Sequence, residues 1–296
     1  MASAQVKPAA AGPAGTVAVG VHAIPARGIE NFYQLNDRVY SGAAPEGDAG
    51  FAALQARGIK TIITVDGAAP DVVAARKYGL RYVHLPIGYD GISSNQAVRL
   101  VKAAETLPGP VFVHCHHGLH RGPAGAAVIC QGIDGWSPDQ AVAWLQLAGT
   151  ATNYAGLYAS VRQFHAPSPA ELRTVPADFP EQSRISPLAD VMVQIDQRFD
   201  HLKLIRKADF KAPPGTPDLD PRNEALQLEE LFKELLRNPV TEKRGKEFRE
   251  LLQQAEQASG VLEAQLKPAV VDRTKAEAGF RRLSESCNAC HQKQRN

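Results

Sequence analysis

The sequence predicts an α/β domain, with a mainly parallel sheet and helices on both faces, followed by an all-α four-helix bundle. Two observations carry this prediction. Short strand-like segments alternate with helix-like segments over residues 28–165, which is typical of parallel strands joined by helices. From residue 188 onward the strand signal ends, and long amphipathic segments separated by proline-containing turns indicate packed helices.

The 296-residue chain is long enough for two domains, and its composition divides it into four parts. Residues 1–22 are rich in Pro, Ala and Gly and are expected to be disordered. The α/β domain is expected at residues 23–165 and the helical domain at residues 188–296. Between them, the prolines of residues 166–187 predict a linker or a docking strap.

Strands and helices follow one another regularly in the first domain. Strands are predicted at residues 38–41, 60–65, 81–85 and 111–114. Helices are predicted at residues 51–57, 69–78, 95–106, 122–130, 137–147 and 154–164. Because ligands bind beyond the carboxyl ends of parallel strands, the loop that follows the last strand is the expected site.

This loop, residues 115–121 (Cys-His-His-Gly-Leu-His-Arg), leads into a helix whose first turn suits Pro123. Its backbone N–H groups and the positive end of the helix would converge on one point. This arrangement can hold a phosphate or sulfate without a metal. Arg121 adds a planar guanidinium that matches two anion oxygens. Cys115 lies in the same positive field, which favours the nucleophilic thiolate.

The loop resembles a known signature. With His114 in front, Cys115 and Arg121 at its ends and a Gly-Pro helix start behind, it is similar to the signature of the cysteine-based protein tyrosine phosphatases, especially the compact dual-specificity branch. The resemblance covers about residues 28–165 and implies hydrolysis of phosphomonoesters through a phosphocysteine. The predicted phosphate-binding groups are then His116, His117, Gly118, Leu119, His120 and Arg121.

The resemblance also implies a general acid. Members of the family carry an aspartate after the strand that precedes the signature strand, and it protonates the leaving oxygen and later activates water. Asp90 occupies the corresponding place, with a plain turn residue as the alternative role and Asp66 as the reserve candidate. Most members have Ser or Thr after the arginine, where the hydroxyl helps the cysteine leave. Gly122 stands there in this chain, which implies slow breakdown of the phosphocysteine.

Two other interpretations of the loop stay open. Imidazole and thiolate suit zinc or copper, so Cys115 could bind a metal together with His114, His116, His117 and His120. The loop could also be purely structural. Cys130 lies nine residues after Arg121, about 13 Å along the same helix, so a disulfide with Cys115 is not expected.

The helical domain is predicted to contain four helices, at residues 188–208, 223–237, 241–259 or 241–266, and 268–293. The last helix ends in Cys287-Asn-Ala-Cys290-His291, which is the spacing of c-type haem attachment. These three residues share one face of a helix, so one haem can meet all of them. A reactive thiol pair or half of a zinc site is the alternative.

A haem motif on the last helix of a four-helix bundle resembles cytochrome c prime and its c-type relatives. The resemblance covers residues 188–296 and implies covalent haem c, with thioethers at Cys287 and Cys290 and with His291 as an iron ligand. In this family the first helix supplies a methionine ligand or an apolar residue that leaves the iron open. Met192 is the candidate ligand and Ile195 the alternative residue over the iron, and Met192 could equally be a core residue.

Charge and hydropathy argue against two classes of protein. A net charge of +2 with mixed signs does not suit a nucleic-acid binder, and no apolar run reaches the length of a membrane span. Ala2-Ser3-Ala4 resembles the end of a signal-peptidase site, so a leader is expected to have been removed, and a plain disordered cytosolic start is the alternative. Because haem c is attached outside the bacterial cytoplasm in the family, a periplasmic protein is implied.

Together these motifs predict a cysteine-dependent phosphatase coupled to a haem c domain that senses redox state or a gas, or transfers electrons. The expected partners are a phosphorylated protein or small molecule and a redox partner. The alternative is an electron-transfer or gas-binding cytochrome whose first domain only binds an anion or a partner.

Overall fold

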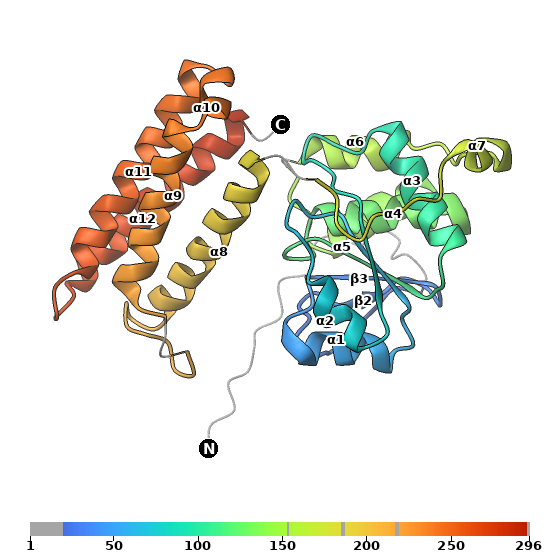
Figure 1. Ribbon diagram of the computed structural model, residues 1–296, viewed down its shortest axis with the longest axis horizontal. Helices are drawn as coiled ribbons and strands as arrows, with labels where there is room; N and C mark the ends of the chain where they lie inside the picture. Colours follow the sequence, from blue (N-terminus) through green and yellow to red (C-terminus); the bar gives the residue numbers. More distant parts are fainter. Residues whose placement is uncertain (1–19, 153, 185–186, 217–218, 295–296) are drawn as a thin grey trace. The chain divides into compact units, whose positions relative to one another are not determined.

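The computed structural model describes residues 20–152, 154–184, 187–216 and 219–294. The chain divides into two compact units, and the first runs to Phe179 apart from the segments Asp66–Asp71 and Pro86–Asp90, which are grouped with the second. Figure 1 shows the sheet of the first unit and the long helices of the second. Most of the predicted disordered segment, residues 1–19, lies outside the described residues.

The first unit is built on a six-stranded mixed sheet with the order β1-β2-β3-β6-β4-β5. The last four strands of that order are parallel, whereas β1 and β2 continue the sheet beyond β3 as an antiparallel edge. The predicted mainly parallel sheet is thus corrected to a mixed one, because two-residue strands are too short to produce a periodic signal. The strands are β1 (His22–Ala23), β2 (Tyr33–Gln34), β3 (Val39–Gly42), β4 (Thr61–Thr64), β5 (Arg81–His84) and β6 (Val111–His114).

Helices cover both faces of this sheet (Figure 1). On one face lie α1 (Gly47–Ala56) and α2 (Val72–Lys77), and there Phe51 packs in one hydrophobic cluster with Ile62 and Phe112. The other face carries α3 (Ser94–Thr106), α4 (Arg121–Asp134), α5 (Pro138–Leu147) and α6 (Ala155–Gln163). The helix α2 is shorter than the predicted segment 69–78.

Alternation along β6 explains how the central strand is buried on both sides. Phe112 belongs to the cluster under α1 and α2, whereas Val113 faces α4. The helix α4 can approach β6 closely because it has Gly125 at this point, where a Cβ would lie 3.5 Å from Val113 Cγ1. Trp144 of α5 is buried and donates its Nε1–H to the Pro123 carbonyl at 3.0 Å. These contacts fix the start of α4 directly above the end of β6.

The predicted linker at residues 166–187 contains the helix α7 (Pro169–Thr174), which begins with a Ser168 capping box. After it, Phe179 is buried, and the guanidinium of Arg99 lies 6.0 Å from the centre of its ring. Arg99 also donates to the Asp178 carbonyl at 3.2 Å. Up to Phe179 this segment therefore packs on the first unit as a strap.

From Pro180 onward the second unit is helical in its described residues. The predicted third helix starts too early, since Gly245, with φ at +89°, separates a short helix from the long one that follows. The predicted fourth helix also starts too early, because residues 268–272 are not helical. The long helices of the second unit share one hydrophobic core, which includes Leu202, Leu228, Leu252 and Leu283. The helices are α8 (Pro187–Lys207), α9 (Pro221–Arg237), α10 (Pro239–Lys243), α11 (Lys246–Leu266) and α12 (Arg273–Gln294). None of the helices in the described ranges is both long enough and apolar enough to cross a bilayer.

Candidate active-site loop and thiol pair

The candidate active-site loop connects the end of β6 to the first residue of α4, Arg121. Cys115 begins the loop as a free thiol, and only 3% of its surface is exposed. Arg121 is half-buried in the first turn of α4. The loop lies at the carboxyl end of a strand that is parallel to both of its neighbours, which is the place that the sequence predicted.

Carbonyl groups along the loop are hydrogen-bonded to the surrounding scaffold. The His116 carbonyl accepts from the backbone N–H of Ala44 at 3.0 Å. The His117 carbonyl accepts from the side chain of Asn31 at 2.9 Å. The same pattern continues at Leu119, whose carbonyl accepts from the Thr150 hydroxyl at 2.6 Å, and at His120, whose carbonyl accepts from the N–H of Ala124 at 3.1 Å.

A trans peptide group holds its C=O and the following N–H on opposite sides. Because the carbonyls of His116, His117 and Leu119 point toward the scaffold, the N–H groups of His117, Gly118 and His120 point away from it. These amides precede the N-terminus of α4, whose partial positive charge adds to theirs. Such an arrangement can bind an oxyanion without a metal.

Gly118 allows the loop to lie against the strand β3. Its φ is +69°, and a Cβ at this position would lie 2.3 Å from the carbonyl carbon of Gly42 and 2.4 Å from the nitrogen of Ala43. Both the backbone conformation and the space therefore require glycine.

Gly122 lies close to the backbone of the candidate nucleophile, Cys115. A Cβ there would lie 2.9 Å from the Cys115 nitrogen and 3.2 Å from the carbonyl carbon of His114. The side chain that the phosphatase resemblance leads one to expect after the arginine would thus meet backbone atoms, which cannot move aside cheaply.

His114 is buried and supports the loop from below. Its Nδ1 lies 3.1 Å from the Cys115 carbonyl and its Nε2 lies 3.3 Å from the Tyr82 hydroxyl. Since a carbonyl only accepts, Nδ1 carries a proton, and Nε2 shares a hydrogen bond with the Tyr82 hydroxyl. Both ring nitrogens are thus engaged, which makes His114 a supporting residue rather than a ligand of the alternative metal site.

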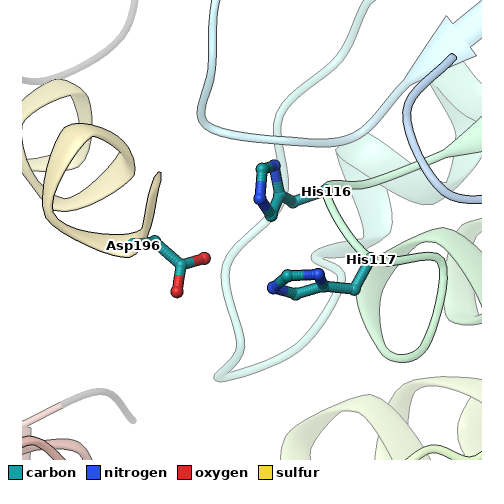
Figure 2. Close-up of side chains that lie close together, drawn as sticks. All are labelled: His116, His117 and Asp196. Atoms are coloured by element: carbon teal, nitrogen blue, oxygen red, sulfur yellow. The ribbon is translucent and has the colours of Figure 1, made fainter. Parts of the chain in front are cut away.

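The remaining loop histidines lie on the loop itself. Figure 2 shows the half-buried side chains of His116 and His117, whose ring centres are 4.3 Å apart. Asp196, also drawn there, belongs to α8 of the second unit. The imidazole of His120 packs against Tyr154, with 4.4 Å between the ring centres.

The candidate general acid, Asp90, is exposed in the connection between β5 and α3. Asp66, the reserve candidate, is buried after β4, and its carboxylate accepts from the N–H of Gly67 at 2.6 Å. Both residues lie in segments that are grouped with the second unit. The role of Asp90 as a general acid stays a prediction.

Cys130 differs from Cys115 in its chemistry. It is fully buried in α4, and burial, followed by the carboxylate of Asp134, raises the pKa of its thiol well above the usual value. Asn36 donates to its sulfur at 3.6 Å. This thiol stays protonated at neutral pH, so Cys130 is a residue of the core and not a second nucleophile.

The haem-motif residues lie near the end of α12. Cys290 is buried in the hydrophobic core, Cys287 packs against the same core, and His291 is exposed. Burial, followed by the neighbouring thiol of Cys290, raises the pKa of Cys287 to about 11. The charges of Asp196 and Lys203 also act on Cys287, so α8 lies beside the thiol pair.

The register between α8 and α12 is set by aromatic and ionic contacts. Phe199 stacks on Phe280 with 5.4 Å between ring centres, and Arg206 pairs with Glu277, so the two helices run antiparallel. Met192 precedes Phe199 by about two helical turns, and Cys287 follows Phe280 by the same distance. Met192 therefore lies at the level of the thiol pair.

Ile195 lies one turn closer to Phe199 on the same helix and is at the level of Ser284, before the motif begins. Met192 is half-buried and packs against the common hydrophobic core of the second unit. The contacts that set this register connect residues far apart in the chain.

Sequence reasoning missed three groups that hold the loop: the side chains of Asn31 and Thr150 and the N–H of Ala44. Asn31 has φ at +49°, a conformation that asparagine adopts more readily than most residues. That preference predicts a turn, but no local signal predicts which distant carbonyl the side chain would reach.

Comparison with known proteins found no family model that matches the chain. The dual specificity protein phosphatase TpbA of Pseudomonas aeruginosa (strain UCBPP-PA14) is 29% identical over 122 residues, which cover 40% of this chain and 55% of that protein. The chain thus spans about half the length of this curated relative. The similarity supports a phosphatase-like domain of the dual-specificity type in the N-terminal half.

Two solved structures are also similar to the chain. The crystal structure of P. aeruginosa TpbA shares 26% identity with a TM-score of 0.41, and the match covers 46% of this chain and 86% of that one. The core catalytic domain of the PP-IP phosphatase SIW14 from S. cerevisiae, solved with citrate, shares 16% identity with a TM-score of 0.43. That match covers 52% of this chain and 93% of the other.

Proposed function

We propose that the chain hydrolyses phosphomonoesters at the loop between β6 and α4, with Cys115 as the nucleophile. The observation that carries this proposal is the orientation of the loop. Its carbonyls are bonded to the scaffold, and its amides face the opposite side at the N-terminus of α4, with a thiol at the start and Arg121 at the end. An arrangement of this kind stabilises the charge of a transferring phosphoryl group.

The proposed reaction has two steps. The Cys115 thiolate attacks phosphorus, the S–P bond forms, and the P–O bond breaks while Asp90 gives its proton to the leaving oxygen. Water then attacks phosphorus and loses a proton to the Asp90 carboxylate. The S–P bond breaks, and inorganic phosphate and the thiolate are released. Arg121 and the loop amides hold the phosphoryl oxygens in both steps.

The second step is proposed to be slow, because Gly122 provides no hydroxyl to assist the departure of Cys115. A Cβ at this position would collide with the Cys115 backbone, so the glycine is part of how the loop is packed. The enzyme is therefore expected to be a phosphatase of modest turnover. Its substrate would be a phosphorylated protein or small molecule.

The test is phosphate release from para-nitrophenyl phosphate by the full chain. Cys115→Ser should lower kcat/KM at least about a thousandfold, because an alcohol replaces the thiolate. Cys130→Ser is the matched control, since it makes the same change in a buried thiol of α4 and should retain the activity. Equal activity of wild type and Cys115→Ser would refute the mechanism.

We further propose that the second unit is a cytochrome c prime-like four-helix bundle that carries haem c on Cys287 and Cys290, with His291 as an iron ligand. The donor set fits this group, since the two thiols lie one turn apart against an apolar core. When bound, haem would supply electron transfer or gas binding at its iron. In a cell, this chemistry would couple the phosphatase to redox state or to a gas, in the periplasm.

Met192 is the proposed sixth ligand, in preference to an open site over Ile195. The register of α8 against α12 supports this choice, because Met192 lies at the level of Cys287 and Ile195 does not. Met192→Leu in the haem-loaded protein should shift the absorption spectrum toward that of iron without a sulfur ligand. Ile195→Leu is the control and should leave the spectrum unchanged.

The competing proposal is a cytochrome whose first unit only captures an anion or a partner. The anion-binding geometry of the loop would serve either function, so turnover decides between them. Phosphate binding without Cys115-dependent turnover, with the iron either ferric or ferrous, would favour the competing proposal. Haem that is removed by acid extraction would show that no thioether holds it.

A further inference from the structure

Two side chains from different segments of the first unit hold the candidate loop by its carbonyls. Asn31 lies in the turn between β1 and β2 and donates to the His117 carbonyl at 2.9 Å. Thr150 follows α5 and donates to the Leu119 carbonyl at 2.6 Å. These donors flank Gly118, the residue with the greatest conformational freedom in the loop.

The peptide group between His117 and Gly118 could adopt two orientations. A flip of the central peptide converts one common turn type into another, and glycine tolerates both conformations. In one orientation an N–H faces the anion, and in the other a carbonyl oxygen would face it and repel it. The bond from Asn31 selects the first orientation, because it requires the His117 carbonyl to point toward the scaffold.

Thr150 has the corresponding effect on the next peptide group but one, which carries the N–H of His120. It is itself fixed: its N–H donates to the Leu145 carbonyl at 2.8 Å, and its carbonyl accepts from the Tyr158 hydroxyl at 2.8 Å. Only 4% of Thr150 is exposed. The hydroxyl is therefore presented to the loop by a rigid and buried support.

Asn31 is supported in a similar way. The adjacent residue, Glu30, accepts the N–H of Ala43 at 2.9 Å, and the next N–H, from Ala44, goes to the His116 carbonyl. The turn that carries Asn31 is thus joined to the same segment that contacts the loop. Its φ of +49° suits Asn, Asp or Gly better than other residues.

We infer that Asn31 and Thr150 are positioning residues that set the loop amides toward the bound phosphoryl group and so determine its affinity for oxyanions. The inference rests on the proposed function of the loop. It assigns a role in the site to the β1–β2 hairpin and to the segment after α5.

The variants Asn31→Gly and Thr150→Val remove the donors while they keep the backbone conformation and the side-chain shape, respectively. Inhibition by inorganic phosphate and by tungstate should weaken about tenfold or more in each variant, which corresponds to one lost hydrogen bond to a charged group. Thr150→Ser retains the hydroxyl and should restore wild-type inhibition to within about twofold.

The control for a general loss of stability is Asn36→Ala. Asn36 accepts the N–H groups of Arg38 and Val39, both at 2.8 Å, and donates to Asp134 at 2.8 Å and to the Cys130 sulfur at 3.6 Å, so these bonds go to residues outside the loop. This variant should unfold more easily but bind tungstate as the wild type does. A purely structural role for Asn31 and Thr150 predicts instead that all these variants lose stability and keep their affinity.

Calorimetric titration of tungstate into each full-length protein separates two kinds of failure, because it needs no turnover. If the wild type binds tungstate but hydrolyses nothing, the proposed function fails and the role of Asn31 and Thr150 is still measured. Wild-type affinity in Asn31→Gly and Thr150→Val would overturn the inference, as would an absence of binding to the wild type.

Discussion

Replacement of Gly118 by alanine should destabilise the first unit through two separable effects. The residue has φ at +69°, and a left-handed conformation costs a non-glycine residue about 1–2 kcal/mol. In addition, the new Cβ would lie 2.3–2.6 Å from backbone atoms of Gly42 and Ala43, and overpacking of this kind costs about 1–3 kcal/mol more. The expected loss in the free energy of unfolding is therefore about 2–5 kcal/mol.

Gly79→Ala isolates the first of these effects. Gly79 also has φ at +69°, but a Cβ there would meet no atom within 4 Å. Gly79→Ala should therefore lower the free energy of unfolding only by the conformational cost of about 1–2 kcal/mol. The difference between the two variants measures the contact between the loop and β3.

Urea unfolding followed by tryptophan fluorescence suits this comparison, because Trp136 and Trp144 are the two tryptophans of the chain and both belong to the first unit. Gly118→Ala should also lose most phosphate release and tungstate binding, whereas Gly79→Ala should retain both. Equal losses of stability in the two variants, or full activity in Gly118→Ala, would refute the reasoning.

Three further predictions concern the two candidate sites. Asp90→Asn should slow the hydrolysis of alkyl phosphates more than that of para-nitrophenyl phosphate, since only the poor alkoxide leaving group needs a proton. An equal effect on both substrates would show that Asp90 is not the general acid. Gly122→Ser should weaken tungstate binding and lower turnover, because its Cβ would lie 2.9 Å from the Cys115 nitrogen, and faster turnover in stopped-flow assays would contradict this. In haem-free protein, the rate at which iodoacetamide alkylates Cys287 should rise with pH through about 11, because the raised pKa keeps this residue in the unreactive thiol form at lower pH. Mass spectrometry of the Cys287 peptide measures the alkylation. Full reactivity at pH 8 would show that burial does not control this thiol.

The order of elements was predictable because each depends on neighbouring residues. The capping boxes at Ser93 and Ser137 begin α3 and α5, and Pro138 stands in the first turn of α5. The strand, glycine-centred loop and helix around Cys115 also form a local pattern. The spacing of Cys287, Cys290 and His291 likewise places them near one another on α12 by helical geometry alone.

Boundaries and edges were less predictable. The antiparallel strands β1 and β2 escaped prediction because two residues carry no measurable alternation. The strap of residues 169–179 depends on Arg99, which reaches Asp178 and the ring of Phe179 from another helix. A proline-rich composition could not distinguish this strap from a free linker.

The sequence by itself determined which residues are the candidates for the chemistry: a thiol and a guanidinium bracket the proposed anion-binding loop, and a pair of thiols precedes a histidine. Only the tertiary structure decided how the loop is held, because Asn31 reaches His117 across 86 positions and Thr150 reaches Leu119 across 31. The same is true of Met192, whose level beside Cys287 follows from the Phe199 and Phe280 stack. Local periodicity reports which face of an element is buried, but the partner of a side chain is set by the packing of distant elements.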